Sequence, residues 1–419
     1  MILLEVGNLW VISLSVAFFL VIMMILVGVL LYARAKLVPS GPVALTINQE
    51  KTLTVESGST LLTTLMQQGI YLPSACGGGG TCAMCKCQII DGAGEILPTE
   101  VGYFSRKEIQ DKWRLSCQVK VRGDLNISVP AEIFGIKKWE CEVISNRNVA
   151  TYIKEFVVRL PEGESMNFQP GGYIQIDVPA IKVDFKDFDV EEKFRPDWDK
   201  YKMWDLKMSN PEPVFRAYSM ANHPAEGNII MLNIRIATPP WDSRTNSFMK
   251  VNPGICSSYV FSLKPGDKVV ISGPYGEFHI KDSNREMVYI GGGAGMAPLR
   301  SHIFHLFQTL KTNRKVSYWY GARSYREVFY EEEFRKIEKE FPNFNFHIAL
   351  SEPLAEDNWQ GYTGFIHQVV LDKYLCSHPE PEEVEFYLCG PPIMNESVLK
   401  MLDSIGIPED MIDLDDFGV

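Results

Sequence analysis

Four cysteines have the spacing of iron ligands. Cys76, Cys82 and Cys85 share one loop with the run Gly77–Gly80, and Cys117 follows after 31 further residues. Four thiolates satisfy one 2Fe–2S cluster, in which three ligands come from a loop and the fourth from a distant strand. The glycines permit positive φ and let backbone N–H groups approach the cluster sulfides. The sequence therefore predicts a 2Fe–2S cluster whose metal ligands are Cys76, Cys82, Cys85 and Cys117.

Zinc is the alternative occupant of these cysteines. Zinc sites usually pair their ligands as two CxxC units, and only Cys82–Cys85 has that spacing. The five residues between Cys76 and Cys82 exceed the plant-type ferredoxin spacing by one, which weakens an identity with plant-type ferredoxin but not the cluster. Cys87 is expected to be a core residue of the following strand. The odd total of nine cysteines, three of them clustered, indicates a reducing compartment and not a disulfide scaffold.

A second motif, Arg216-Ala217-Tyr218-Ser219, suits a flavin. An arginine fork binds a pyrophosphate, a tyrosine stacks on the flavin, and a serine hydroxyl can hydrogen-bond ring N5, which accepts hydride. Downstream, the segment Gly254–Ser258 offers backbone N–H donors to a diphosphate at the start of a helix. The predicted FAD-binding residues are Arg216, Tyr218, Ser219, Gly254, Cys256 and Ser257.

A third motif predicts a nicotinamide dinucleotide site. The strand Val288–Ile290 continues into the glycine turn Gly291–Gly295 and then into a helix with Pro298 near its start. Such a helix N-terminus accommodates a pyrophosphate. At a second buried-looking strand end, the thiol of Cys389 is expected to point into the crevice of an open sheet. The predicted nucleotide-site residues are Gly291, Gly293, Gly295, Pro298, Cys389, Gly390 and Pro391.

The pattern of expected strands and helices changes along the chain. Short alternating strands and one helix surround the cysteines, and mostly antiparallel strands follow from Trp139 to Ser272, which suggests a β-barrel. After Met287, apolar strands alternate with helices, as in a doubly wound parallel sheet. The expected fold is multidomain α+β and α/β. Its expected parts are a transmembrane helix (3–33), a β-grasp ferredoxin domain (43–130), an antiparallel β-barrel FAD domain (135–282) and an NADH domain (283–419).

The N-terminal run Val6–Ala33 has no charged residue and is 28 residues long. A helix of that length spans a bilayer core of about 30 Å with some tilt. A cleaved signal peptide is the alternative, but no positive residue precedes the run and it is about twice the usual apolar length. Arg34 and Lys36 follow it, which places the bulk of the chain in the cytoplasm by the positive-inside tendency.

Composition narrows the function further. The 419 residues suggest about three domains, and the formal net charge of −11 makes nucleic acid a poor partner. The segment Ile181–Phe215 is dense in Asp, Lys and aromatic residues without a clean period. We expect either a solvated insertion or a surface that docks a partner.

The order of cluster, flavin and nucleotide segments resembles the ferredoxin–NAD(P)H reductase superfamily with a fused ferredoxin domain. Together with the N-terminal helix, the insertion Ile181–Phe215 and the tail Met411–Val419, it closely resembles the F-subunit family of bacterial sodium-translocating NADH:quinone oxidoreductases. The resemblance extends over essentially the whole chain.

The resemblance implies an NADH-oxidising electron-input protein, single-pass in the bacterial inner membrane. Hydride would pass from NADH to FAD, steered by Ser219 and Cys389 as catalytic residues. Single electrons would then pass to the 2Fe–2S cluster and on to membrane subunits that reduce ubiquinone and move sodium. Phe417 would stack near the flavin. The family implies NADH, although Arg323 and Ser324 after the strand Val316–Tyr320 would by chemistry alone accept a 2′-phosphate.

Two other functions share these motifs. The first is the NAD(P)H reductase component of a multicomponent oxygenase, which needs no membrane helix. The second is a membrane-tethered iron–sulfur sensor that binds nucleotide without turnover.

Overall fold

The computed structural model describes residues 2–37 and 41–416, which form two compact units. The first unit comprises Met1–Leu72 and Ala83–Phe134, and the second comprises Pro73–Cys82 and Gly135–Val419. The fold class expected from the sequence is confirmed, with one qualification for the flavin-binding sheet given below.

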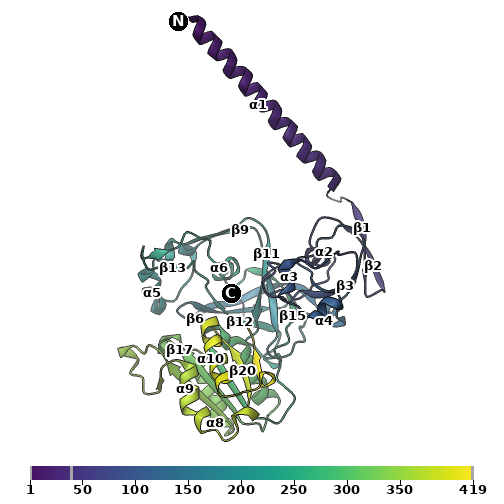
Figure 1. Ribbon diagram of the computed structural model, residues 1–419. Coiled ribbons are helices and arrows are strands. Elements are labelled where there is room, and N and C mark those ends of the chain that lie inside the picture. Colours follow the sequence, from purple (N-terminus) through teal and green to yellow (C-terminus); the bar gives the residue numbers. More distant parts are fainter. Residues whose placement is uncertain (1, 38–40, 417–419) are drawn as a thin grey trace. The chain divides into compact units, whose positions relative to one another are not determined.

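The chain begins with α1 (Ile2–Leu37), one uninterrupted helix (Figure 1). Its stretch Leu14–Tyr32 is 19 residues long and apolar enough to cross a membrane, and none of it is buried against the protein. An exposed helix with apolar side chains on all sides needs an apolar surrounding, which a bilayer supplies.

A mixed five-stranded sheet forms the rest of the first unit, in the order β2-β1-β5-β3-β4. The predicted hairpin is β1 (Pro42–Ile47) with β2 (Lys51–Glu56), and β1 pairs in parallel with β5 (Leu125–Ser128). The helix α2 (Leu61–Gln67) buries Leu61, Leu62 and Leu65, and the Thr60 hydroxyl caps its N-terminus by accepting from the Thr63 N–H. The remaining elements are β3 (Lys86–Asp91), α3 (Pro98–Val101), α4 (Arg106–Gln110) and β4 (Trp113–Leu115).

The flavin-binding segment folds as a six-stranded antiparallel sheet in the order β11-β8-β15-β6-β7-β12. Its edge strands approach each other through one bridge, Met220 to Leu232, and the Ala221 N–H donates to Met231 O at 2.7 Å. Within the described residues no continuous ladder closes the sheet, so the expected β-barrel is corrected to a strongly curved open sheet. The strands are β6 (Lys137–Ala150), β7 (Ile153–Arg159), β8 (Tyr173–Val178), β11 (Val214–Ser219), β12 (Ile229–Arg235) and β15 (Lys268–Tyr275).

The insertion is folded, and the expectation of a solvated segment is wrong for its aromatic side chains. β9 (Ile181–Asp184) and β10 (Lys207–Asn210) pair as a ribbon, and α5 (Arg195–Lys200) lies between them in sequence. Trp198 on α5 is fully buried, and its Nε1 donates to Thr151 O at 2.8 Å. The other buried aromatic side chains are Phe185, Phe188 and Phe194. These side chains belong to one buried cluster. They are spaced irregularly along short turns, so the regular spacing of apolar residues in a helix or strand could not predict their burial.

The nucleotide-binding segment forms a six-stranded, wholly parallel sheet in the order β19-β18-β17-β16-β20-β21. Its central strands are buried on both faces, as parallel strands must be. The strands are β16 (Met287–Gly292), β17 (Val316–Ala322), β18 (Phe344–Leu350), β19 (Tyr362–Thr363), β20 (Glu385–Cys389) and β21 (Ile412–Leu414). The helices are α7 (Met296–Phe304), α8 (Glu331–Glu340), α9 (Ile366–Lys373) and α10 (Pro392–Ser404).

One predicted helix is corrected. The sequence predicts a single helix over 298–309, but α7 ends at Phe304 and a π-helical turn continues it over His305–Thr309. Such turns are frequent at functional sites. The spacing of apolar residues does not distinguish this π-helical turn from α-helix, because the same side chains fit both conformations.

Candidate functional site

The cysteines are arranged as two pairs, one in each unit. Cys76 and Cys82 have their sulfurs 3.4 Å apart, and Cys85 is hydrogen-bonded to Cys117. Two thiolates on one tetrahedral metal ion lie about 3.8 Å apart when the metal–sulfur bonds are about 2.3 Å. In the described residues no three His, Cys, Asp or Glu side chains are arranged to hold a single metal ion. Within each unit, two of the four predicted ligands therefore lie next to each other.

The cysteine loop supplies hydrogen bonds to its own sulfur. The Cys82 thiol and backbone N–H groups, among them that of Thr81, lower the pKa of Cys76 to about 3. In the other pair, the hydrogen bond with Cys117 and burial raise the pKa of Cys85. A metal cation is the partner that allows two adjacent thiols to be ionised together.

Gly77 shows why the loop is glycine-rich. It has a φ of +65°, and an added Cβ would fall on the Arg216 guanidinium and on Phe215 O. Gly78 also has positive φ, and its N–H donates to the Ser74 hydroxyl at 3.1 Å. Cys87 is fully buried in β3, which agrees with the expected core position.

The flavin motif lies at the end of edge strand β11. Arg216 is half-buried, and its Nη1 donates to Phe215 O at 2.7 Å, so the other nitrogens of its fork are available to a ligand. Tyr218 hydrogen-bonds Cys256, and burial raises the pKa of both groups, to about 12 for the thiol. The two predicted parts of the flavin site, β11 and the start of α6 (Ile255–Ser262), therefore meet through these side chains.

At the start of α6, the side chain of Ser257, which was predicted to contact the diphosphate, is already hydrogen-bonded within the protein. The Ser257 hydroxyl accepts from the Ala237 N–H at 3.1 Å and donates to Gly254 O at 3.2 Å. An added Cβ on Gly254 would lie 2.5 Å from the Ala237 Cβ, so a glycine is required. The Cys256 thiol is already hydrogen-bonded to Tyr218, and the Ser257 hydroxyl to Ala237 and Gly254. The backbone N–H groups of the first helical turn are therefore the donors left for a diphosphate.

The nucleotide motif has the predicted strand–turn–helix form. β16 ends at Gly292, Gly293 takes a φ of +57°, and α7 begins at Met296. An added Cβ on Gly295 would fall on the backbone of Cys389 and lie 2.7 Å from Gly390 N.

Gly293, in contrast, borders open space. An added Cβ there would have one neighbour within 4 Å, Ile153 at 3.9 Å. Close packing is therefore required behind the turn, while its open side leaves room for a pyrophosphate.

Gly291 is packed like Gly295: its added Cβ would lie 2.6 Å from Leu299. Pro298 is the third residue of α7 and is buried, so it stiffens the helix start. After the neighbouring strand β20, Pro391 is the N-cap residue of α10. Gly390 O accepts a hydrogen bond from the Asn395 amide at 3.0 Å. These residues shape the two loops at the carboxyl edge of the parallel sheet, where ligands of such sheets bind.

Asp415 joins the flavin motif to the nucleotide motif. The Ser219 hydroxyl donates to Asp415 Oδ2 at 2.6 Å, and the Asp415 N–H donates to Leu388 O at 3.0 Å. Burial raises the pKa of Asp415 to about 6, and burial with the Asp415 charge raises that of Cys389. Asp415 thus connects Ser219, through its carboxylate, to the residue that precedes Cys389, through its backbone N–H.

The sequence prediction missed Asp415. The available indication was the pair Asp415-Asp416 directly before Phe417 at the end of the chain. Phe417 itself lies outside the described residues.

The cofactor-selecting position lies at the end of β17. Arg323 is exposed, and its carbonyl accepts from the Glu352 N–H at 2.7 Å, whereas Ser324 is buried. Both follow the strand as expected, and their geometry is compatible with either nicotinamide dinucleotide.

Three family models match successive parts of the chain. A 2Fe-2S iron-sulfur cluster binding domain matches residues 45–122, an oxidoreductase FAD-binding domain matches 194–280, and an oxidoreductase NAD-binding domain matches 289–400. The chain therefore carries a 2Fe–2S cluster, FAD and a site for NADH, in the order along the sequence that was predicted.

Full-length relatives share this organisation. The F subunit of the Na(+)-translocating NADH-quinone reductase of Pseudomonas aeruginosa is 55% identical over 407 residues, which cover 97% of this chain and 98% of the relative. The protein of the same name from Neisseria meningitidis is 54% identical over 97% of this chain and 99% of its own.

Solved structures agree on the fold. The ferredoxin reductase of carbazole 1,9a-dioxygenase is 26% identical with a TM-score of 0.58, over 90% of this chain and 98% of that one. The Amycolatopsis cytochrome P450 reductase GcoB has a TM-score of 0.62 at 22% identity, with the same coverage, and indicates the fold alone.

Proposed function

This chain belongs to the F-subunit family of Na(+)-translocating NADH-quinone reductases, and we propose that electrons from NADH enter such a complex through it. Hydride passes from NADH to FAD, and electrons then pass singly to the 2Fe–2S cluster and on to membrane subunits. Bound flavin supplies the chemistry of accepting two electrons together and releasing them one at a time. Ubiquinone reduction and sodium movement take place in the other subunits.

The observation that carries the proposal is the connection that Asp415 makes between Ser219 and the end of the strand that carries Cys389. The serine belongs to the flavin motif and the cysteine to the nucleotide motif, and they lie 170 positions apart in the sequence. Asp415 connects the two, because its carboxylate accepts the Ser219 hydroxyl proton at 2.6 Å and its N–H donates at 3.0 Å to the carbonyl of Leu388, the residue before Cys389. We assign Ser219 to the flavin N5 edge and Cys389 to the nicotinamide, where they orient donor and acceptor.

The other flavin contacts follow from the free donors. Arg216 and the N–H groups at the start of α6 would bind the diphosphate of FAD, and Tyr218 would lie against the flavin. The open side of the turn at Gly293 would hold the pyrophosphate of NADH. Phe417 would cover the flavin, as the family resemblance implies.

The cluster ligands proposed are the two thiol pairs, Cys76 with Cys82 and Cys85 with Cys117. Each pair would serve one iron, and the N–H groups of the glycine loop would stabilise the cluster charge.

For the membrane location, we propose that α1 crosses the bacterial inner membrane once. Arg34 and Lys36 directly follow its apolar stretch, so the bulk of the chain would lie on the cytoplasmic side, where NADH is found. Its partners would be the other membrane subunits of the complex.

The domain limits proposed are 3–33 for the membrane helix, 43–130 for the ferredoxin domain, 135–282 for the FAD domain and 283–419 for the NADH domain. NADH is the proposed donor in preference to NADPH, although the exposed Arg323 could meet a 2′-phosphate. A direct comparison of the two donors tests that preference.

Cys76→Ala tests the order of electron flow. In the complex, this variant should lose NADH-driven quinone reduction, because one cluster ligand is missing, yet keep NADH oxidation by a soluble dye that takes electrons from flavin. Cys376→Ala, which removes an exposed cysteine, is the matched control and should keep both activities. Loss of both activities in Cys76→Ala with FAD still bound would contradict the order.

A further inference from the structure

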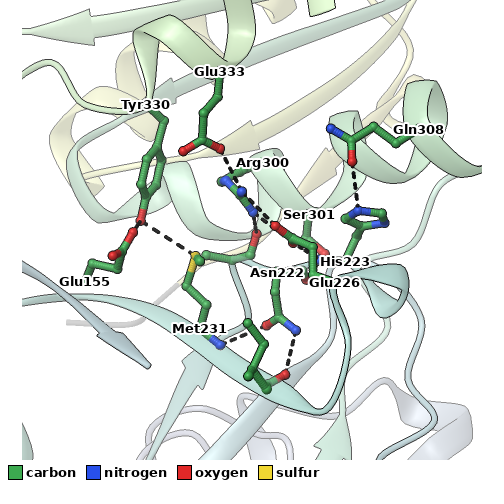
Figure 2. Close-up of polar contacts among 12 residues, drawn as sticks. Glu155, Asn222, His223, Glu226, Met231, Arg300, Ser301, Gln308, Tyr330 and Glu333 are labelled. Carbon is green, nitrogen blue, oxygen red and sulfur yellow. Dashed lines mark hydrogen bonds and ion pairs between the residues drawn. The ribbon is translucent and has the colours of Figure 1, made fainter. Parts of the chain in front are cut away.

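Arg300 is a buried arginine whose partners lie on different parts of the second unit. It sits in the middle of α7, and 4% of its side chain is exposed. Its fork donates to Ala221 O at 2.9 Å, to Glu226 at 2.8 and 3.0 Å, and to Glu333 on α8 at 2.8 Å (Figure 2). The guanidinium also lies 4.0 Å above the Phe304 ring. One side chain thus joins the nucleotide-binding part to the segment that follows the flavin motif.

The next residue on α7 makes a parallel contact. Ser301 donates its hydroxyl proton to Asn222 O at 2.7 Å. Arg300 and Ser301 therefore hold two consecutive carbonyls, those of Ala221 and Asn222. These are the second and third residues after Ser219, so α7 is attached almost directly to the proposed N5 contact.

The same segment is fixed from its other side. The Asn222 amide accepts from the Met231 N–H at 2.9 Å and donates to Ile229 O at 2.8 Å, both at β12 (Figure 2). Glu226 accepts from the His223 N–H at 2.8 Å as well as from Arg300. With both faces bonded, the segment has little freedom to move independently of α7.

The start of α7 lies beside the residues proposed to bind NADH. Gly295 packs against the backbone of Cys389 and Gly390, and Gly293 borders the open space proposed for the pyrophosphate. A single helix therefore contacts the nicotinamide-side cysteine loop at its start and the flavin-side serine segment at its middle. Its position determines the distance between the two.

Stability alone gives no sufficient reason for this arrangement. Arg300 Nε is buried without a hydrogen-bond partner among the described residues. Buried charge networks with an unsatisfied donor are often no more stable than apolar packing of similar volume. The arginine instead fixes the orientation of the segments around it, because its planar fork donates to three acceptor residues at once.

We propose that Arg300 is a positioning residue for hydride transfer, which sets the spacing between nicotinamide and flavin by tying α7 to the segment after Ser219. The inference rests on the proposed function, because it assumes that NADH reduces the flavin. A shift of 1 Å in a reacting pair can cost about 100-fold in rate. The residue should therefore affect the rate of transfer more than the binding of either partner.

The test is anaerobic stopped-flow reduction of the full-length purified protein, with FAD and cluster bound, over a series of NADH concentrations. For Arg300→Met we expect the limiting rate of flavin bleaching to fall about 10- to 100-fold. The half-saturating NADH concentration and the FAD content should change little. The long-wavelength charge-transfer absorbance of stacked nicotinamide and flavin should weaken, and Arg300→Lys should restore part of the rate.

Arg335→Met is the matched control, because Arg335 also makes several polar contacts, with Glu331 and Glu338 on α8 and with Phe346 O on β18, but these partners lie outside the segment after Ser219. Its limiting rate should equal that of the wild type. Ser301→Ala, which removes one of the two carbonyl contacts, should show a smaller fall than Arg300→Met. If Arg300→Met does not retain FAD, Ser301→Ala and Arg300→Lys decide the question by the same readouts.

A wild-type limiting rate in Arg300→Met would overturn the inference. So would a loss confined to NADH half-saturation or to FAD content, with the limiting rate and the charge-transfer absorbance unchanged. If NADH does not bleach the wild-type flavin, the proposed function itself fails, and the inference fails with it.

Discussion

The carboxylate of Asp415 predicts a measurable pH dependence of stability. It accepts the Ser219 hydroxyl proton at 2.6 Å, and burial raises its pKa from 3.8 to about 6. In an unfolded chain the same group would titrate near its ordinary value. Asp415→Asn keeps the shape of the side chain and removes the titration.

The sign follows from proton linkage. Between pH 3.8 and 6 the folded protein holds a proton on Asp415 that the unfolded chain has lost, so stability falls as the pH rises through this window. A shift of about 2 pKa units corresponds to about 3 kcal/mol. Because the side chain is only partly buried, solvent screening makes this an upper limit.

Urea unfolding of the FAD-bound protein, followed by flavin fluorescence from pH 4 to pH 7, gives the free energy of unfolding. The wild-type value minus the Asp415→Asn value should fall by up to about 3 kcal/mol as the pH rises. Asp410→Asn, which removes an exposed carboxylate of the same tail, is the control and should show no such trend.

A flat difference across pH 4 to 7 would refute the reasoning. It would mean that Asp415 ionises as it does in water, and therefore that the tail does not bury it against Ser219. The connection between the flavin and nucleotide motifs through Asp415 would then lose its basis.

Three further predictions concern the turn, the insertion and the membrane helix. Gly295→Ala places a methyl group on the backbone of Cys389, so the Kd for NADH should rise at least about tenfold by titration, whereas Gly123→Ala, at an open position, should leave it unchanged. Trp198→Ala should lower the free energy of unfolding by about 3–5 kcal/mol in urea, because it empties a fully buried site and frees Thr151 O; a loss under 1 kcal/mol would contradict the packed insertion. Deletion of residues 1–35 should move the chain from the membrane to the soluble fraction with NADH–dye activity intact but quinone reduction lost, and unchanged quinone reduction would contradict the anchor.

Strong local patterns made most of the fold predictable. The predicted strands Val288–Ile290 and Val316–Tyr320 lie within β16 (Met287–Gly292) and β17 (Val316–Ala322), because each is a short apolar run before a turn. The four cysteines and the glycine turn at Gly293 were predictable because their chemistry depends on close sequence spacing.

What the sequence could not reveal depends on contacts between distant segments. Asp415 belongs to an acidic stretch that looks like solvated surface, and Arg300 is a single charge in the largely apolar run Met296–Phe304. Neither shows a role until its partner, Ser219 or Glu226, is placed beside it. The curvature of the flavin sheet depends on how its edge strands meet, which alternation along one strand does not encode.

The central claim is that electrons pass from NADH through flavin to the cluster held by Cys76, Cys82, Cys85 and Cys117. Anaerobic titration of the purified full-length protein with NADH, followed by visible absorbance and low-temperature EPR, tests it most directly. The account predicts bleaching of the flavin together with a rhombic signal from one reduced 2Fe–2S cluster. Flavin bleaching without that signal would contradict it, because the cluster would then be absent or out of reach of the electrons.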